Sequence, residues 1–226
     1  MEVIKSPETP GFKSAIARSI ALPFLFVLLL WIVKIVEIFS GVSLADFGII
    51  PRTFSGLTGI LTSVFIHGGG IDVKLNGLKV FDHLLSNTIP LLILGSGLMF
   101  FYRNVAVKVF MFIWLIGGFW VWLFARPASH IGASGLIYGM AAFLFFSGVL
   151  KKNRNLLAIS LLTVFLYGGL AWGIFPVDER ISWEGHLPAA LPVYSAHLFS
   201  EEKVHRKKKK NGRMKMMTMM RMQSGG

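Results

Sequence analysis

The sequence GASGLIYGMAAFLFFSGVL, residues 132–150, contains no charged side chain and decides the fold. The stretch from Ser134 to Leu150 is close to the length that an α-helix needs to cross about 30 Å of hydrocarbon. The chain is 54% hydrophobic over its 226 residues, whereas soluble domains average about 45–50%. These observations predict an integral membrane protein, with Ser134 at the mouth of one of its helices.

Similar apolar runs lie on both sides of this one. A sixth stretch begins near His186 and is weaker, because Pro188 and Pro192 disfavour a helix interior and the apolar residues end by about Phe199. The pattern predicts an all-α membrane protein, a bundle of six transmembrane helices in which the sixth is short or distorted. The other predicted spans cover residues 20–39, 84–102, 105–124 and 156–175.

Basic residues between the spans predict the orientation, because cytoplasmic loops are rich in Lys and Arg. We therefore expect both termini in the cytoplasm, and Ser134 and His186 at the outer ends of the fourth and sixth spans. The basic residues precede the first span, fill the turns after the second and fourth spans, and follow the sixth: Lys5, Lys13, Arg18, Arg103, Lys108, Lys151, Lys152, Arg154 and His205–Lys210.

The chain is expected to form one membrane domain with short flanking regions. We predict a cytoplasmic leader at 1–17, the membrane domain at 18–200 with an outer loop at 40–82, and a basic, Met-rich, disordered tail at 201–226. Much of the net charge of +12 lies in this tail, which we interpret as contact with anionic lipid and not with nucleic acid. Cysteine is absent, so a disulfide framework and a thiolate metal site are excluded.

Ser134 and His186 are the candidate nucleophile and base. A serine hydroxyl becomes reactive when a base removes its proton, and a neutral imidazole titrates in the range to do so. No Asp or Glu is obviously placed to orient the imidazole, so the sequence predicts a dyad instead of a triad. His83 and Asn87 share a helix face at the outer end of the second span and, with the backbone N–H of Ser134, are candidate oxyanion donors.

Other residues near Ser134 are expected to support this chemistry. Gly132 and Gly135 leave room for a substrate backbone, and Tyr138, one turn further, is expected to pack on the imidazole of His186. Water has to reach an acyl-enzyme from the outer side, so we predict a polar cavity bounded by spans two, four and six. No zinc-binding pattern is present, so neither a metal site nor a cofactor is predicted.

Each candidate also has a purely structural interpretation. Gly135 and Gly139 form a small-xxx-small pattern that brings helices together. His186 could be an interfacial residue, and His83 and Asn87 could cap a helix or bond each other. The functional interpretation rests on four polar groups that share one membrane level on three helices. No role is predicted for His67, His130, His197 and His205, and Lys34 and Glu37 are expected to pair or to reach the interface.

The motifs HLLSN (His83–Asn87), GASG (Gly132–Gly135) with Tyr138, and EGH (Glu184–His186) resemble the rhomboid family of intramembrane serine proteases in order and separation. The similarity extends from about residue 18 to 187, and the segments Pro51–Thr53 and Phe65–Gly68 look like bacterial members. The resemblance implies a Ser134 nucleophile, a His186 base and an oxyanion site formed by His83, Asn87 and the Ser134 backbone. It also implies cleavage of transmembrane protein substrates near the outer face of a bacterial inner membrane.

Two segments depart from the family pattern. Residues 69–81 (GGIDVKLNGLKVF) look like an insertion just before His83, which either displaces that side chain or bulges outward. The prolines after His186 shorten the last span, and a frameshift in the gene at this point is a hypothesis that resequencing would test. An alternative to the protease is therefore a catalytically impaired rhomboid-like scaffold that binds membrane clients. A solute transporter is disfavoured, because the chain has neither an internal repeat nor a midplane charge pair.

Overall fold

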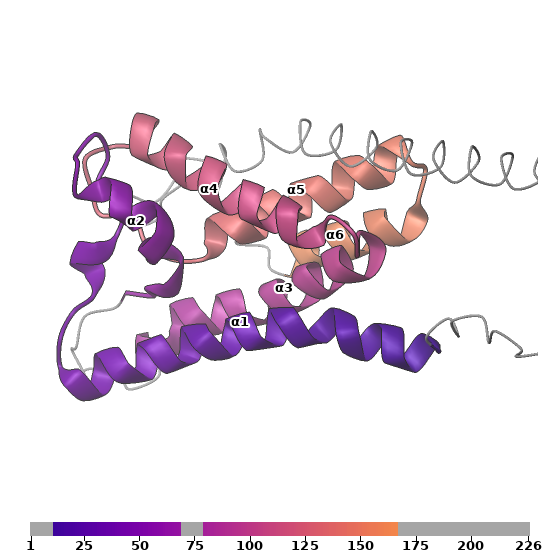
Figure 1. Cartoon of the computed structure of the whole chain (residues 1–226), viewed down its shortest axis with the longest axis horizontal. Helices are drawn as coiled ribbons and strands as arrows, with labels where there is room; N and C mark the ends of the chain where they lie inside the picture. The colour runs from indigo at the N-terminus through magenta and orange to yellow at the C-terminus, as the bar shows by residue number, and fades with distance from the viewer. Residues whose placement is uncertain (1–10, 69–78, 167–226) are drawn as a thin grey trace, which may run out of the picture.

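The computed structural model describes residues 11–68 and 79–166, and over these ranges the chain is a bundle of helices (Figure 1). Outside the helices, the same residues contain an isolated antiparallel bridge between Ile49 and His130. In chain order the elements are α1 (Phe12–Ser40), the 3-10 helix η1 (Ala45–Phe47), α2 (Gly56–Thr62), the 3-10 helix η2 (Ser63–Phe65), α3 (Lys79–Phe101), α4 (Ala106–Phe124), α5 (Ser134–Leu150) and α6 (Arg154–Leu166).

The described helices confirm the all-helical fold. Three of them are long and apolar enough to cross a membrane, with candidate spans at Lys13–Ser40, His83–Phe101 and Ala106–Phe124. The shorter apolar helices α5 and α6 follow them. Backbone groups in hydrocarbon can be satisfied only within helices or closed barrels, so long apolar runs specify helices almost regardless of what surrounds them. The sixth span and the last part of the fifth lie outside the described residues.

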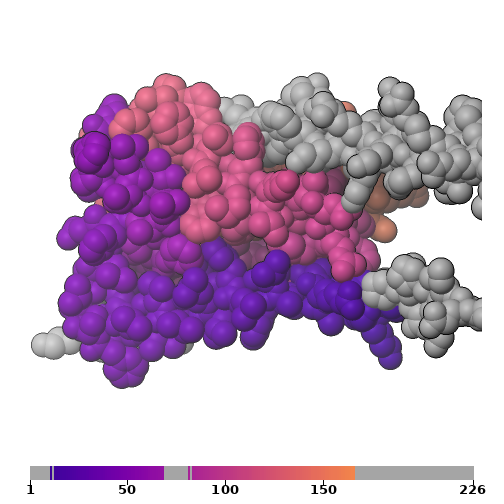
Figure 2. All heavy atoms as spheres, in the orientation of Figure 1, coloured from indigo at the N-terminus to yellow at the C-terminus, as the bar shows by residue number. Residues whose placement is uncertain are grey.

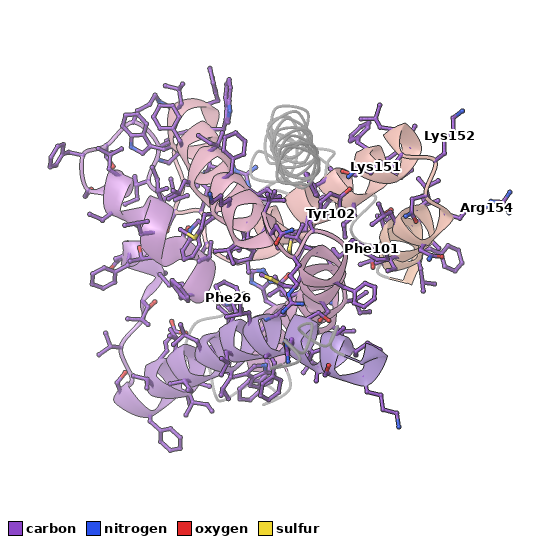
Figure 3. The ribbon with its side chains drawn as sticks, turned by 45° about the vertical axis from the view of Figure 1, so that its right-hand side comes forward. Phe26, Phe101, Tyr102, Lys151, Lys152 and Arg154 are labelled. Carbon is purple, nitrogen blue, oxygen red and sulfur yellow. The ribbon has the colours of Figure 1, made fainter. Side chains whose placement is uncertain are left out.

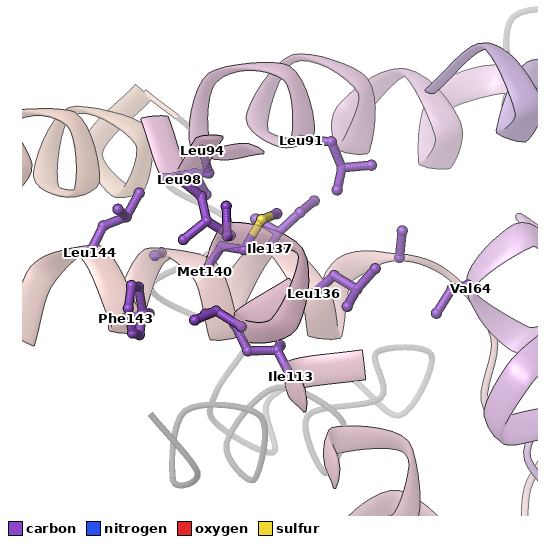
Figure 4. Packing of buried hydrophobic residues seen from close by; sticks show 14 of the residues in the cluster. Val64, Leu91, Leu94, Leu98, Ile113, Leu136, Ile137, Met140, Phe143 and Leu144 are labelled. Atoms are coloured by element: carbon purple, nitrogen blue, oxygen red, sulfur yellow. The ribbon is translucent and has the colours of Figure 1, made fainter. Parts of the chain in front are cut away.

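Helix α5 lies at the centre of the bundle. Its buried residues cover a broad face that packs against α3, α4 and α6, whereas Phe146, Val149 and Leu150 are exposed on the other side. Figure 4 shows Leu136, Ile137, Met140 and Phe143 of α5 packed among leucines of α3 and Ile113 of α4. Packing against three neighbouring helices fixes the position of α5, whose first residue is Ser134.

Helix α1 runs along one side of the bundle and buries two charged side chains. Lys34 is 2% exposed and Glu37 5% exposed, and the Lys34 Nζ lies 2.9 Å from Glu37 Oε2. The other carboxylate oxygen of Glu37 accepts a hydrogen bond from the Leu44 N–H at 3.1 Å. The expected pairing is confirmed, and the pair joins α1 to the segment that follows it.

Residues 41–68, which follow α1, are anchored to the rest of the bundle by polar contacts. Ile49 and His130 exchange two backbone hydrogen bonds of 2.9 Å, just before the start of α5. Arg52 donates to the Ala125 carbonyl at the end of α4 at 2.8 Å, and Trp114 Nε1 donates to the Ile60 carbonyl at 2.8 Å. This segment is therefore a fixed wall beside Ser134.

The helix ends fall into two groups. The serine end of the bundle holds the C-termini of α1 and α4, the N-termini of α3 and α5, and the α2 segment (Figure 1). The basic end holds the opposite helix termini, and its exposed cations in the described part of the chain are Lys13, Arg18, Arg103, Lys108, Lys151, Lys152 and Arg154. Ser134, His83 and Asn87 belong to the same end, because α3 and α5 are separated by one crossing, α4, and therefore run in the same direction.

Candidate active site

Ser134 is the first residue of α5, and its position depends on the short segment before it. Ala133 is the N-cap residue, and its own side chain makes no capping hydrogen bond. The Gly132 N–H donates to the Ser63 carbonyl at 2.9 Å, which ties the segment to η2. The positive end of the α5 dipole therefore points to the space around Ser134, where a negative charge would be stabilised.

His83 of α3 lies directly against the Gly132 backbone. A Cβ atom added at Gly132 would fall 2.8 Å from His83 Cε1 and 3.0 Å from His83 Nε2. Gly132 also has a φ of +103°, a conformation that side chains disfavour. Only glycine combines this backbone turn with this close approach. The imidazole of His83 therefore packs against the backbone of Gly132, which precedes Ser134 by two residues.

Asn87 lies one turn along α3 from His83. Its side chain is 5% exposed, and among the described residues its Nδ2 has no hydrogen-bond partner. A buried donor without a partner destabilises the folded protein by about 1–3 kcal/mol. An unpaired amide at this position is therefore a candidate for a functional role. An unsatisfied N–H at the same end of the bundle as Ser134 is suited to bind an oxyanion that forms only during a reaction.

His67 belongs to this cluster, although the sequence predicted no role for it. The residue is 1% exposed, its Nε2 accepts the Ala133 N–H at 3.3 Å, and its ring packs edge-to-face on His83 with centroids 5.3 Å apart. Burial, followed by the charges of His83 and Lys34, lowers the pKa of His67 to about 3. The ring is therefore neutral at pH 7 and remains a hydrogen-bond acceptor. The segment Phe65–Gly68, which looks like bacterial rhomboids, was the signal that could have identified it.

A cavity of about 60 Å³ adjoins Ser134 and Gly135 between α2, α4 and the start of α5. Ser63, His130 and Ser134 contribute polar groups to its mainly apolar lining. This volume is enough for a few water molecules with several polar partners. The predicted cavity was assigned to spans two, four and six, whereas this one is bounded by α2 and by spans three and four.

The structure places most of the residues singled out from the sequence at the serine end of the bundle. Gly132 contacts His83, Gly135 lines the cavity with Ser134, and Tyr138 is half-buried in the next turn of α5. His186 lies outside the described residues, as do the tail and most of the proposed insertion, residues 69–78. Residues 79–81 form the start of α3.

Comparisons with known proteins identify a family and several relatives of the chain. The family model of the Rhomboid domain matches residues 55–199, a range that includes every candidate site residue. Uncharacterized proteins of Mycobacterium tuberculosis and Mycobacterium bovis are each 36% identical to the chain over 190 residues, covering 77% of this chain and 72% of theirs. A Mycobacterium leprae protein, also uncharacterized, is 33% identical over 185 residues, covering 77% of this chain and 69% of its own. No solved structure matches the chain.

Proposed function

The chain belongs to the rhomboid family, and on this basis we propose that it is a serine endopeptidase that cleaves transmembrane proteins within the membrane. Ser134 is the nucleophile and His186 the general base. His83, Asn87 and the Ser134 N–H stabilise the oxyanion. Gly132, Gly135 and Tyr138 shape the site, and the protein needs no metal or cofactor. The observation that carries the proposal is the contact of His83 with Gly132 beside Ser134.

The reaction proceeds in two stages. Ser134 Oγ attacks the substrate carbonyl carbon while His186 removes its proton, and the carbonyl oxygen becomes an oxyanion. The imidazole of His83, the Asn87 amide and the helix N-terminus stabilise that charge. When the intermediate collapses, the proton on His186 passes to the departing amine and leaves an acyl-enzyme. Water then attacks the ester, with His186 again as the base, and restores Ser134.

The site favours a substrate with an unwound backbone. Gly135 has no side chain that would obstruct an extended peptide next to Ser134, and Gly132 lets the His83 imidazole approach the same backbone. A helical substrate, in contrast, keeps its carbonyls in internal hydrogen bonds. The cavity beside Ser134 supports a supply of water for the second stage. We infer that a transmembrane helix unwinds near the serine end and presents one peptide bond there.

Replacement of the two dyad residues tests the assignment. In the purified full-length protein, Ser134→Ala and His186→Ala should each abolish cleavage of a model transmembrane substrate and labelling by a fluorophosphonate probe. Ser86→Ala is the matched control, because Ser86 is exposed on α3 between His83 and Asn87 and its hydroxyl donates only to its own helix, to the His83 carbonyl at 2.9 Å. Undiminished cleavage by the Ser134→Ala protein rules out the proposed nucleophile.

A scaffold that binds membrane clients is the second candidate function. It is favoured by Pro188 and Pro192, which shorten the span that carries His186. If the protein binds a transmembrane client but neither cleaves it nor reacts with a fluorophosphonate, the scaffold is the better assignment. Activity that appears when the last span is replaced by an uninterrupted apolar helix would identify these prolines as the cause.

We also propose that the serine end faces the outside of a bacterial inner membrane and that both termini lie in the cytoplasm. The basic residues at the other end of the bundle support this orientation. Cleavage would then occur near the outer surface. Residues 1–17 would be a cytoplasmic leader and residues 201–226 a tail that contacts anionic lipid.

A further inference from the structure

A second cavity, of about 350 Å³, lies between α1 and α4 on the lipid-facing side of the bundle. Figure 2 shows this side of the molecule, with α1 in indigo and α4 in pink. The floor is formed by α3 and by Met140 of α5. We call this cavity the α1/α4 groove; it is lined by Leu22, Pro23, Leu25, Phe26, Leu29, Leu91, Gly95, Leu98, Met99, Val107, Phe110, Met111 and Met140.

The groove is apolar and runs parallel to the helices in the half of the bundle nearest the basic end. From Leu22 to Leu29 it extends for about 10 Å along α1, at 1.5 Å per residue. Its walls expose aliphatic side chains, with Leu25 56% and Val107 51% exposed. A volume of about 350 Å³ over this length corresponds to a mean cross-section of about 35 Å². This cross-section accommodates one extended hydrocarbon chain, whereas a helix about 10 Å across needs roughly twice as much.

Cations surround the end of the groove at the basic end. Arg18 precedes Leu22 by one turn of α1, so the stripe formed by residues 18, 22, 25 and 29 follows a single helix face. Lys108 adjoins Val107 in the first turn of α4, and Arg103 lies in the turn between α3 and α4. All three side chains are exposed. Among the described residues, Lys34 and Glu37 form the one salt bridge. Arg18, Arg103 and Lys108 therefore have no acidic partner within this part of the chain.

We propose that the α1/α4 groove binds one acyl chain of an anionic phospholipid, whose headgroup contacts Arg18, Arg103 and Lys108. The groove matches such a lipid, because cations lie at its end near the membrane surface and apolar side chains line the part that extends toward the membrane centre. A zwitterionic lipid would fill the same groove without using the cations. Because the site is remote from Ser134, this inference does not depend on the proposed protease activity.

Lipid titration of the purified full-length protein tests the proposal. Native mass spectrometry would measure binding of dioleoyl-phosphatidylglycerol and of dioleoyl-phosphatidylcholine, which differ only in the headgroup. We expect one tightly held lipid per chain and at least fivefold tighter binding of the anionic lipid. Arg18→Gln combined with Lys108→Gln should weaken binding of the anionic lipid about tenfold or more, since each basic residue near the surface contributes roughly a fivefold factor.

Two matched variants separate a defined site from general attraction. Lys152 and Arg154 are exposed at the same end but beside α6, away from Phe26 and the groove (Figure 3). Lys152→Gln with Arg154→Gln removes the same charge and should leave the affinity unchanged. Leu25→Trp fills the groove and should weaken binding of both lipids, whereas Leu28→Trp, on the same helix but outside the lining, should weaken neither.

Several outcomes would overturn the proposal. Equal affinity for the two lipids would show that the cations do not select a headgroup. Equal losses in the two double Gln variants would show diffuse attraction to the basic end. Binding that survives Leu25→Trp would show that the acyl chain does not occupy the groove.

Discussion

Asn87 is a buried amide that carries a cost in the resting protein. Its Nδ2 has no partner among the described residues, and such a group is destabilising by about 1–3 kcal/mol. The neighbouring Thr88 is different, because its hydroxyl donates to the Leu84 carbonyl at 2.8 Å and accepts Trp31 Nε1 at 3.1 Å. The two residues therefore allow the proposed oxyanion role of Asn87 to be compared with a polar side chain whose hydrogen bonds are satisfied within the bundle.

We predict that Asn87→Ala reduces the rate of substrate cleavage about 10²–10³-fold, the usual effect of losing one oxyanion donor. The melting temperature should stay the same or rise, because no hydrogen bond of the Nδ2 group within the described residues is lost. Thr88→Val should give the reverse pattern, with lower thermal stability and largely retained cleavage. A marked loss of stability in Asn87→Ala would mean that its amide has a structural partner.

Gly132 combines a left-handed backbone with close contact to His83. We predict that Gly132→Ala lowers cleavage at least tenfold, because the new Cβ displaces the imidazole, and destabilises the protein by about 1–2 kcal/mol. Gly41 is the matched control, because its φ is +70° and a Cβ added there would meet no atom within 4 Å. Gly41→Ala should have a similar cost in thermal unfolding and keep its activity. Equal activities of the two variants would show that the His83 contact does not matter.

Lys34 and Glu37 connect one helix to the segment that walls the site. The pair lies on the inner face of α1 near its C-terminal end, and Glu37 also accepts a hydrogen bond from the Leu44 N–H. A buried charge that loses its partner is expensive, about 3–5 kcal/mol, whereas removal of both charges together is much less so.

We predict that Lys34→Met destabilises the protein strongly in thermal unfolding, because it leaves the Glu37 carboxylate buried and unpaired. The double variant Lys34→Met with Glu37→Gln should recover most of that stability, since the amide oxygen can still accept the Leu44 N–H. The coupling between the two positions is the quantity to measure. Independent, additive effects would mean that the two side chains do not act as a pair.

The orientation of the whole molecule can be tested directly, because the chain contains no cysteine. Ser55, at the start of α2, and Lys152, in the turn after α5, are exposed at opposite ends of the bundle. In intact bacterial cells a membrane-impermeant maleimide should label Ser55→Cys, and it should label Lys152→Cys only after the membrane is permeabilised. The opposite labelling pattern would place Ser134 at the cytoplasmic side and reverse the proposed topology.

The positions of the helices followed from the sequence. The predicted span at 134–150 coincides with α5, and that at 105–124 differs from α4 by one residue. This agreement has a simple reason: hydrocarbon offers no hydrogen bonds, so an uncharged apolar run of sufficient length becomes a helix whatever its neighbours are. Consecutive crossings then alternate in direction, which is why His83, Asn87 and Ser134 could be assigned to one end from the sequence alone.

The contacts between helices depended on the tertiary structure. Nothing in the order of residues indicated that the His83 ring touches Gly132, that His67 accepts the Ala133 N–H, or that the Lys34–Glu37 pair faces inward. Such contacts depend on how each helix is rotated about its axis and how closely it approaches the next. Those variables are decided by packing among residues far apart in the chain. The sequence by itself therefore determined which segments cross the membrane and at which end the polar groups lie, and the tertiary structure alone decided which of those groups meet.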